Sequence, residues 1–213
     1  LEFRRVLFRS GLDYHRLDAD GTLCIGALCR HEDLEFSTII GESHPTLAAA
    51  AALVADPIVR TRGTFVGSVC HADPQGDWAA CMVALDGHIV ARGPRGTRTI
   101  KVREFVTGPF QNVLDPDEIA IEAVMPAPTG VAHGGYLKLE RRVGDFATAA
   151  VAVAVDIAGG TVRRAGIALT GVGSTTVHAV EAGEALVGSA LTEATIQRAA
   201  ELAANAAKPR SDH

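Results

Sequence analysis

The stretch RTRGTFVGSVCHADPQGDWAA, Arg60–Ala80, contains three glycines within twenty-one residues, and its spacing decides which fold the sequence predicts. Gly63 and Gly67 each stand next to a hydroxyl side chain, Thr64 and Ser68. Glycine has no Cβ, so backbone amides beside it can approach a ligand closely, and clustered amides bind anions such as phosphate. The first half of the stretch therefore suggests an anion-binding loop.

The second half of the stretch carries two carboxylates, Asp73 and Asp77, four residues apart. On a helix they would share one face. Carboxylates repel phosphate, so their expected partners are sugar or ribityl hydroxyls, and the two halves together suggest a nucleotide cofactor. The spacing fits neither the Rossmann glycine motif nor the P-loop. An ordinary strand–turn–helix connection, with Asp73 capping the helix, explains the same residues and stays open.

Composition narrows the classes of protein. The chain has 213 residues, 47% of them hydrophobic, and a net charge of −5, which argues against a sequence-independent nucleic-acid binder. The longest apolar run, Leu47–Ala55, is too short to span a bilayer, so we expect no transmembrane segment. The four cysteines form no C-x-x-C pair, which argues against zinc or iron–sulfur clusters on this chain and favours reduced thiols in a cytoplasmic protein.

Local signals divide the chain into an α/β first part and a sheet-rich second part. In the first part we expect a hairpin over Tyr14–Leu28 and helices over Ser43–Ala55 and Asp73–Leu85. A strand–turn–strand over Gly87–Phe105 and a further strand over Asp117–Pro128 are expected to follow. Residues 1–10, LEFRRVLFRS, fit no element and are expected to be a non-native or disordered leader.

Thr129–His133, a small-residue stretch, is the expected linker to the second part. Three strand-length runs follow, with Gly159–Gly160 as the turn between the last two, and then two helices, the second capped by Thr192. The predicted class is α+β, with a three-stranded antiparallel sheet and helices at the end.

The glycine stretch closely resembles the R-x-R-G-T-I-G-G-S-x-x-H-A-D-P-x-x-D segment of the FAD-binding medium subunits of molybdenum hydroxylases. That family includes aerobic carbon monoxide dehydrogenase and xanthine dehydrogenase. The resemblance continues in GPRGTRTI, LDPDEI, GGYLKLERRVGDFATAAVAVAV and RAGIALTGVG, and covers nearly all of Tyr14–Asp212.

The resemblance implies a PCMH-type (vanillyl-alcohol-oxidase-like) FAD-binding domain over 11–128 and the family's C-terminal α+β domain, truncated, over 134–213. By the same resemblance the chain is expected to lack the family's first βαβ unit. The expected function is electron transfer through FAD, from [2Fe–2S] clusters of a small partner subunit to an external acceptor. Molybdopterin is expected on a large partner subunit, and no catalytic or metal-ligating residue is expected here. A xanthine or N-heterocycle dehydrogenase subunit and a truncated interaction module without flavin are the alternatives.

Seven residues match cofactor-binding positions of the family. Thr64, Gly67 and Ser68 match its pyrophosphate loop, and Asp77 matches its ribityl-binding carboxylate. By the same resemblance Leu114 and Phe146 lie near the isoalloxazine ring, and Lys138 is a polar residue near the flavin. Lys138 could instead be the solvated edge of a strand, and Leu114 and Phe146 could be plain core.

Val66 replaces a family glycine. If that position needs positive φ or close approach to the pyrophosphate, valine is unfavourable there, and Val66→Gly would tighten FAD binding.

Overall fold

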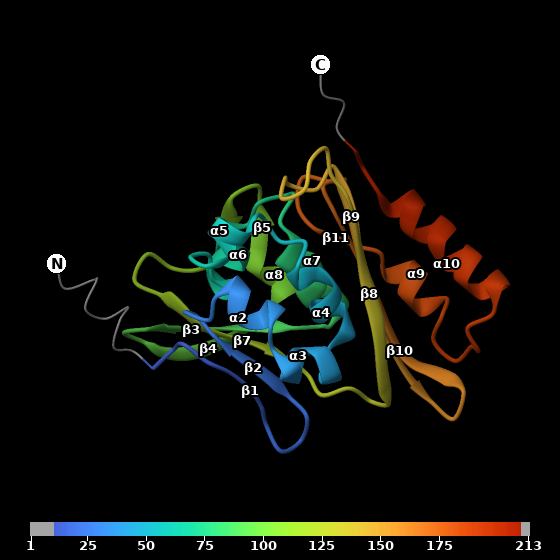
Figure 1. Cartoon of the computed structure of the whole chain (residues 1–213), viewed down its shortest axis with the longest axis horizontal. Helices are drawn as coiled ribbons and strands as arrows, with labels where there is room; N and C mark the ends of the chain where they lie inside the picture. Colours follow the sequence, from blue (N-terminus) through green and yellow to red (C-terminus); the bar gives the residue numbers. More distant parts are fainter. Residues whose placement is uncertain (1–10, 210–213) are drawn as a thin grey trace.

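Two antiparallel sheets enclose most of the helices of the protein, as the computed structural model of residues 11–209 shows (Figure 1). The expected leader at residues 1–10 lies outside the described residues. The first sheet has five strands in the order β1-β2-β7-β3-β4. Their bounds are His15–Leu17 for β1, Leu23–Gly26 for β2, His88–Gly93 for β3, Gly96–Lys101 for β4 and Ile119–Met125 for β7. The expected hairpins and the late strand are confirmed.

The second sheet has four strands in the order β11-β10-β9-β8, one more than predicted. The bounds are Val131–Leu139 for β8, Ala149–Ala158 for β9, Thr161–Thr170 for β10 and Val177–His178 for β11. Gly159 and Gly160 form the turn between β9 and β10 with φ of 60° and 72°, a conformation that a β-branched residue resists. Strand β11 has only two residues, so it contains no alternation of apolar and polar residues from which a strand could be predicted.

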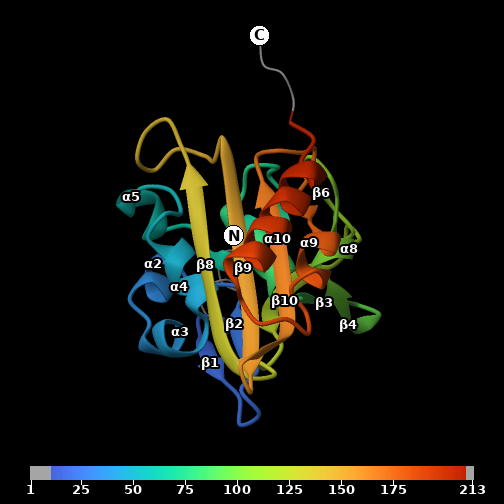
Figure 2. The same ribbon diagram turned by 90° about the vertical axis from the view of Figure 1, so that its right-hand side faces the viewer.

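Short helices fill the space between the two sheets. Their bounds are His31–Glu35 for α2, Thr38–Ser43 for α3, Pro45–Ala51 for α4, Pro57–Arg60 for α5, Phe65–His71 for α6, Asp77–Ala84 for α7 and Val102–Phe105 for α8. A small two-stranded sheet, β5 (Val106–Gly108) and β6 (Gln111–Asn112), follows α8. Helices α9 (Val180–Glu184) and α10 (Glu193–Ala206) cover the far face of the second sheet (Figure 2).

Two predicted helix starts are wrong. Ser43 ends α3, and α4 begins after His44 with Pro45 at its first position. Helix α7 begins at Asp77 and not at Asp73, because Asp73 and Pro74 form a turn instead. In that turn Asp73 Oδ1 accepts the Gln75 N–H at 2.9 Å, and Gly76 is the N-cap of α7. Asp73 and Asp77 therefore do not share a helix.

The expected linker is also shorter than predicted, since Val131–His133 belong to β8. Thr129 is held to the second sheet, because its N–H and its hydroxyl both donate to Asp156 Oδ2, at 2.8 and 3.1 Å. A continuous core lies between the sheets and includes Trp78 on α7 and Ala152 on β9. No helix within residues 11–209 is long and apolar enough to cross a bilayer.

Candidate functional site

A cavity of about 150 Å³ lies between α6, the start of α7 and the loop that follows β8. It brings together three of the predicted cofactor residues, Ser68, Asp77 and Phe146. Its full lining is His31, Val54, Ala55, Val59, Ser68, His71, Asp73, Gly76, Asp77, Gly144, Asp145 and Phe146. The lining joins residues from both halves of the chain, and we call it the α6–α7 cavity.

Asp77 is the most constrained side chain of the α6–α7 cavity. It is 6% exposed, and its Oδ1 accepts the Tyr136 hydroxyl at 2.5 Å while its Oδ2 accepts Lys138 Nζ at 3.2 Å. Burial raises the pKa of Asp77, and the hydrogen bond from Tyr136 and the charge of Lys138 oppose that shift. The carboxyl group is thus fixed in place by two donors from β8.

Lys138 donates a hydrogen bond to Asp77 but does not itself line the cavity. Its side chain is 1% exposed, and Nζ also donates to the Leu53 carbonyl at 2.9 Å and lies 3.4 Å from Glu140 Oε2. A buried ammonium needs such partners because its desolvation is costly. Lys138 therefore positions the Asp77 carboxyl group, and its place near the flavin stays a prediction.

The start of α6 differs from an open anion-binding loop. Thr64 is its N-cap, and the Thr64 hydroxyl accepts the Gly67 N–H at 3.3 Å. Gly67 lies inside the helix, so its amide is already used. Val66 also has helical backbone and is 1% exposed, packed in the core. The premise that Val66 stands where positive φ or contact with a pyrophosphate is needed is therefore wrong.

Leu114 lies apart from the α6–α7 cavity. It is half-buried against the main core, and its N–H donates to Asn112 Oδ1 at 3.0 Å. Phe146, by contrast, is 60% exposed at the cavity. An exposed phenyl ring beside a polar cavity is available to stack on a planar ligand.

Unusual backbone conformations cluster around the cavity. Ala55 has φ of 54° and Gly144 has φ of 89°, and both line the cavity. Ala72, with φ of 54°, ends α6 between two further lining residues, His71 and Asp73. Positive φ at alanine is unfavourable and occurs preferentially at functional sites.

His31 and Tyr136 are site residues that the sequence analysis missed. His31 is the first residue of α2, and Tyr136 lies on β8. Both are buried, and both meet partners far away in the chain, Trp78 and Asp77. Local pattern contains no signal for such pairs.

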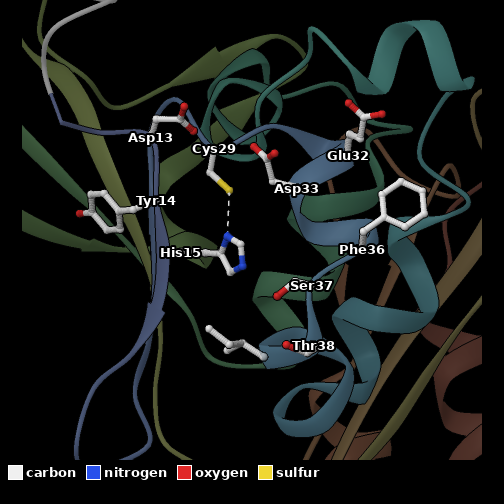
Figure 3. A pocket seen from close by; sticks show the side chains of 10 residues that line it. Asp13, Tyr14, His15, Cys29, Glu32, Asp33, Phe36, Ser37 and Thr38 are labelled. Carbon is white, nitrogen blue, oxygen red and sulfur yellow. Dashed lines mark hydrogen bonds between the residues drawn. The ribbon is translucent and has the colours of Figure 1, made fainter.

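A second, open groove of about 660 Å³ lies between β1 and the α2–α3 region (Figure 3). His15 Nδ1 and Cys29 Sγ are 3.7 Å apart in it. Burial and the charges of Asp33 and Asp13 raise the pKa of the Cys29 thiol to about 12, so it stays protonated at neutral pH and is a poor nucleophile. Within residues 11–209 no cluster of His, Cys, Asp and Glu has metal-binding geometry.

Comparison with known proteins matches the chain along almost its whole length. The family model described as the FAD binding domain in molybdopterin dehydrogenase matches residues 10–128, and the CO dehydrogenase flavoprotein C-terminal domain matches residues 135–213. The carbon monoxide dehydrogenase medium chain of Hydrogenophaga pseudoflava is 38% identical over 90% of this chain and 67% of its own length.

Solved structures agree with this similarity. Carbon monoxide dehydrogenase from Hydrogenophaga pseudoflava, in a form lacking the Mo-pyranopterin moiety, superposes with a TM-score of 0.88 at 39% identity. That match covers 94% of this chain and 70% of the other. Quinoline 2-oxidoreductase from Pseudomonas putida 86 gives 0.84 at 31% identity, over 95% of this chain and 70% of the other.

Proposed function

We propose that the chain, which belongs to the FAD-binding medium subunits of molybdenum hydroxylases, passes electrons through FAD as part of a complex that resembles carbon monoxide dehydrogenase. The observation that carries the proposal is the match of both family models, in order, over residues 10–128 and 135–213. The electrons come from [2Fe–2S] clusters of a small subunit and go to an external acceptor.

The proposed partners are a large molybdopterin-binding subunit and that small iron–sulfur subunit. The thiols of this chain support the placement of the clusters elsewhere: Cys24, Cys29, Cys70 and Cys81 are all unbridged, and three of them are buried. Burial raises the pKa of Cys70 to about 11, which disfavours the thiolate that a cluster requires. Unbridged thiols also support the cytoplasm as the compartment.

For the fold we propose a PCMH-type FAD-binding domain over 11–128, joined to the C-terminal α+β domain over 134–213. The ranges of the two family models support this division. The chain spans about two thirds of the length of the Hydrogenophaga medium chain.

The residues of the α6–α7 cavity fit one part of FAD. Its volume of about 150 Å³ is below the roughly 300 Å³ typical of small ligand sites, so the cavity fits a segment of a dinucleotide. Asp77 can accept hydrogen bonds from ribityl hydroxyls through its remaining lone pairs. Ser68 can donate to the same chain or to the pyrophosphate beside it.

Each other predicted residue has a specific proposed part. Thr64 Oγ1 accepts a hydrogen bond from the Gly67 N–H, which leaves the Thr64 O–H free to donate to a phosphate oxygen. Gly67 thus orients the Thr64 hydroxyl group. Lys138 holds the Asp77 carboxyl group in place, and Phe146 stacks on the isoalloxazine ring. Leu114, which lies outside the cavity, is proposed as the apolar residue against the isoalloxazine ring. Bound FAD supplies the redox chemistry, and the protein supplies position and electrostatics.

A xanthine or N-heterocycle dehydrogenase subunit remains the second candidate, favoured by the match to quinoline 2-oxidoreductase. The two candidates differ in the partner subunit that oxidises substrate. A non-catalytic interaction module without flavin is the candidate from another class. Flavin absorbance after reconstitution with FAD separates this module from the other two, because only they hold FAD.

The residue-level test compares Asp77→Asn with Asp73→Asn in a titration with FAD. Loss of the Asp77 charge is expected to weaken binding by about 1.5–3 kcal/mol, the range for hydrogen bonds to a charged group. Asp73 already accepts the Gln75 N–H, so its change is expected to loosen the turn and to alter FAD affinity by less than about 1 kcal/mol. Equal effects of the two changes on the dissociation constant would contradict the proposed role of Asp77.

A further inference from the structure

His31 is a buried residue that lines the α6–α7 cavity. It is the first residue of α2 and is 5% exposed. Its backbone N–H donates to the Gly63 carbonyl at 3.1 Å, which ties α2 to the glycine stretch. His31 lines the same cavity as Ser68 and Asp77.

The tautomer of His31 is fixed by its neighbour. The indole N–H of Trp78, which can only donate, points to His31 Nδ1 at 2.9 Å, so Nδ1 must be the acceptor and the proton must sit on Nε2. Burial, followed by the charges of Arg60 and Arg30, lowers the pKa of His31 to about 4. At neutral pH the ring is therefore uncharged, with one N–H to donate.

Gly63 provides the space for that ring. A Cβ at Gly63 would lie 2.6 Å from both Cδ2 and Nε2 of His31, closer than such atoms approach in proteins. The glycine is thus required by the position of the ring. Within residues 11–209, the hydrogen bond from Trp78 is the only one made by the ring, which leaves the Nε2–H available.

The polar groups around the cavity select the ligand atom. Three carboxylates line it, Asp73, Asp77 and Asp145, and they would repel a phosphate. A hydroxyl group both accepts and donates, so it can accept from the fixed N–H of His31 and donate to a carboxylate.

We propose that His31 donates a hydrogen bond from Nε2–H to a ribityl hydroxyl of FAD, as the donor side of a polyol subsite whose acceptor side is Asp77. This assignment rests on the proposed function. It makes His31 a cofactor-binding residue, with Trp78 and Gly63 as the groups that position it.

The test is a fluorescence titration of wild type and variants with FAD and with riboflavin. Because both ligands carry the ribityl chain, His31→Phe is expected to weaken both by the same factor, about tenfold to a hundredfold. His31→Gln keeps an acceptor for Trp78 and a donor for the ligand, and is expected to recover most of the affinity. His133→Phe, at an exposed position on β8, is the matched control and is expected to bind like wild type.

The outcomes separate the two proposals. Failure of the wild-type chain to bind FAD would overturn the proposed function and this assignment with it. Wild-type binding that His31→Phe leaves unchanged would overturn only the assignment. Loss of FAD affinity with unchanged riboflavin affinity would overturn the ribityl contact in favour of a phosphate contact.

A measurement on the wild-type protein covers the case in which His31→Phe does not fold. In ¹⁵N-histidine spectra, His31 is expected as the Nε2–H tautomer at neutral pH, with its Hε2 resonance shifting when FAD is added. The Nδ1–H tautomer, or an Hε2 resonance that FAD does not move, would overturn the assignment.

Discussion

At the residue scale, three buried polar side chains are linked by hydrogen bonds that centre on Asp77. Lys138, Tyr136 and Asp77 satisfy one another in a place with almost no access to water. Removal of one of these groups would leave a buried partner with one hydrogen bond fewer, which typically costs about 1–3 kcal/mol. Substitutions at these positions therefore act on stability as well as on cofactor binding.

Val66 offers a test in which stability and cofactor binding separate. Val66→Gly removes a side chain that is 1% exposed and puts glycine into α6. We expect a loss of about 2–4 kcal/mol in the free energy of unfolding, from the cavity and from the helix propensity of glycine. Urea denaturation measures it, with Val66→Ala as the smaller-effect control. Tighter FAD binding by the folded variant would contradict the packing role of Val66.

The buried His44 is expected to make the stability of the protein depend on pH. It is 2% exposed, and burial, followed by the charge of Arg164, lowers its pKa to about 4. The unfolded chain, with a histidine pKa near 6.5, binds more protons between these two values, so stability present at pH 7 is lost as the pH falls from about 6.5 to about 4. His31 acts in the same direction, whereas the raised pKa of Asp77 acts in the opposite one.

The His44 contribution is isolated by comparing variants. Urea denaturation at pH 7, 6 and 5 is expected to show a shallower loss of stability for His44→Gln than for wild type, by up to about 1.4 kcal/mol per pH unit. His133→Gln, at an exposed position, is the control and should follow wild type. If the free energy of unfolding falls equally steeply with pH in His44→Gln and in wild type, His44 has the same pKa in the folded and the unfolded protein.

At the scale of elements, β10 is packed closely on both faces. A Cβ at Gly166 on β10 would lie 1.9 Å from the Ala84 carbonyl oxygen at the end of α7. On the other face, a Cβ at Gly183 on α9 would lie 2.8 Å from the Ala165 carbonyl oxygen. Backbone can approach backbone this closely only where side chains are absent, so the two glycines set the spacing of three layers.

Gly166→Ala is therefore expected to push α7 away from the second sheet. The expected loss in the free energy of unfolding is about 1–3 kcal/mol or more, the range for overpacking. Gly135→Ala on β8 is the matched control, because nothing lies within 4 Å of a Cβ there, and it is expected to be neutral or slightly stabilising. Equal losses for the two variants in chemical denaturation would contradict the close approach of β10 and α7.

At the scale of the whole molecule, one core joins the segments matched by the two family models. Ile25, Phe65 and Trp78 from the first segment lie in the same buried cluster as Tyr136 and Ala152 from the second. Between the sheets, α6 packs on β2 and β7 of the first sheet, and α7 packs on β9 and β10 of the second. Each segment therefore contributes to the stability of the other.

We expect one cooperative unfolding transition for the chain. Trp78 is the single tryptophan, and it is fully buried where the two segments meet, so its fluorescence reports on that packing. Far-UV circular dichroism reports on the helices and strands of both segments. The two probes are expected to give the same urea midpoint, and an earlier midpoint for either one would indicate segments that unfold separately.

The sequence alone determined the features that depend on a few neighbouring residues. The β9–β10 turn follows from Gly159–Gly160, the start of α10 from the Thr192 cap, and the family from motifs spread along the chain. Backbone preferences and caps act within one turn of the chain, so they can be seen in local pattern.

Only the tertiary structure decided which polar groups meet. His31 and Trp78 are 47 residues apart in the chain, and Asp77 and Tyr136 are 59 apart. The tertiary structure also places Val66 in the core, and it begins α7 at Asp77, whereas the local pattern predicts a start at Asp73. Such contacts arise when two sheets close around the same helices, and the hydrogen bond gained there depends on burial that no single segment achieves.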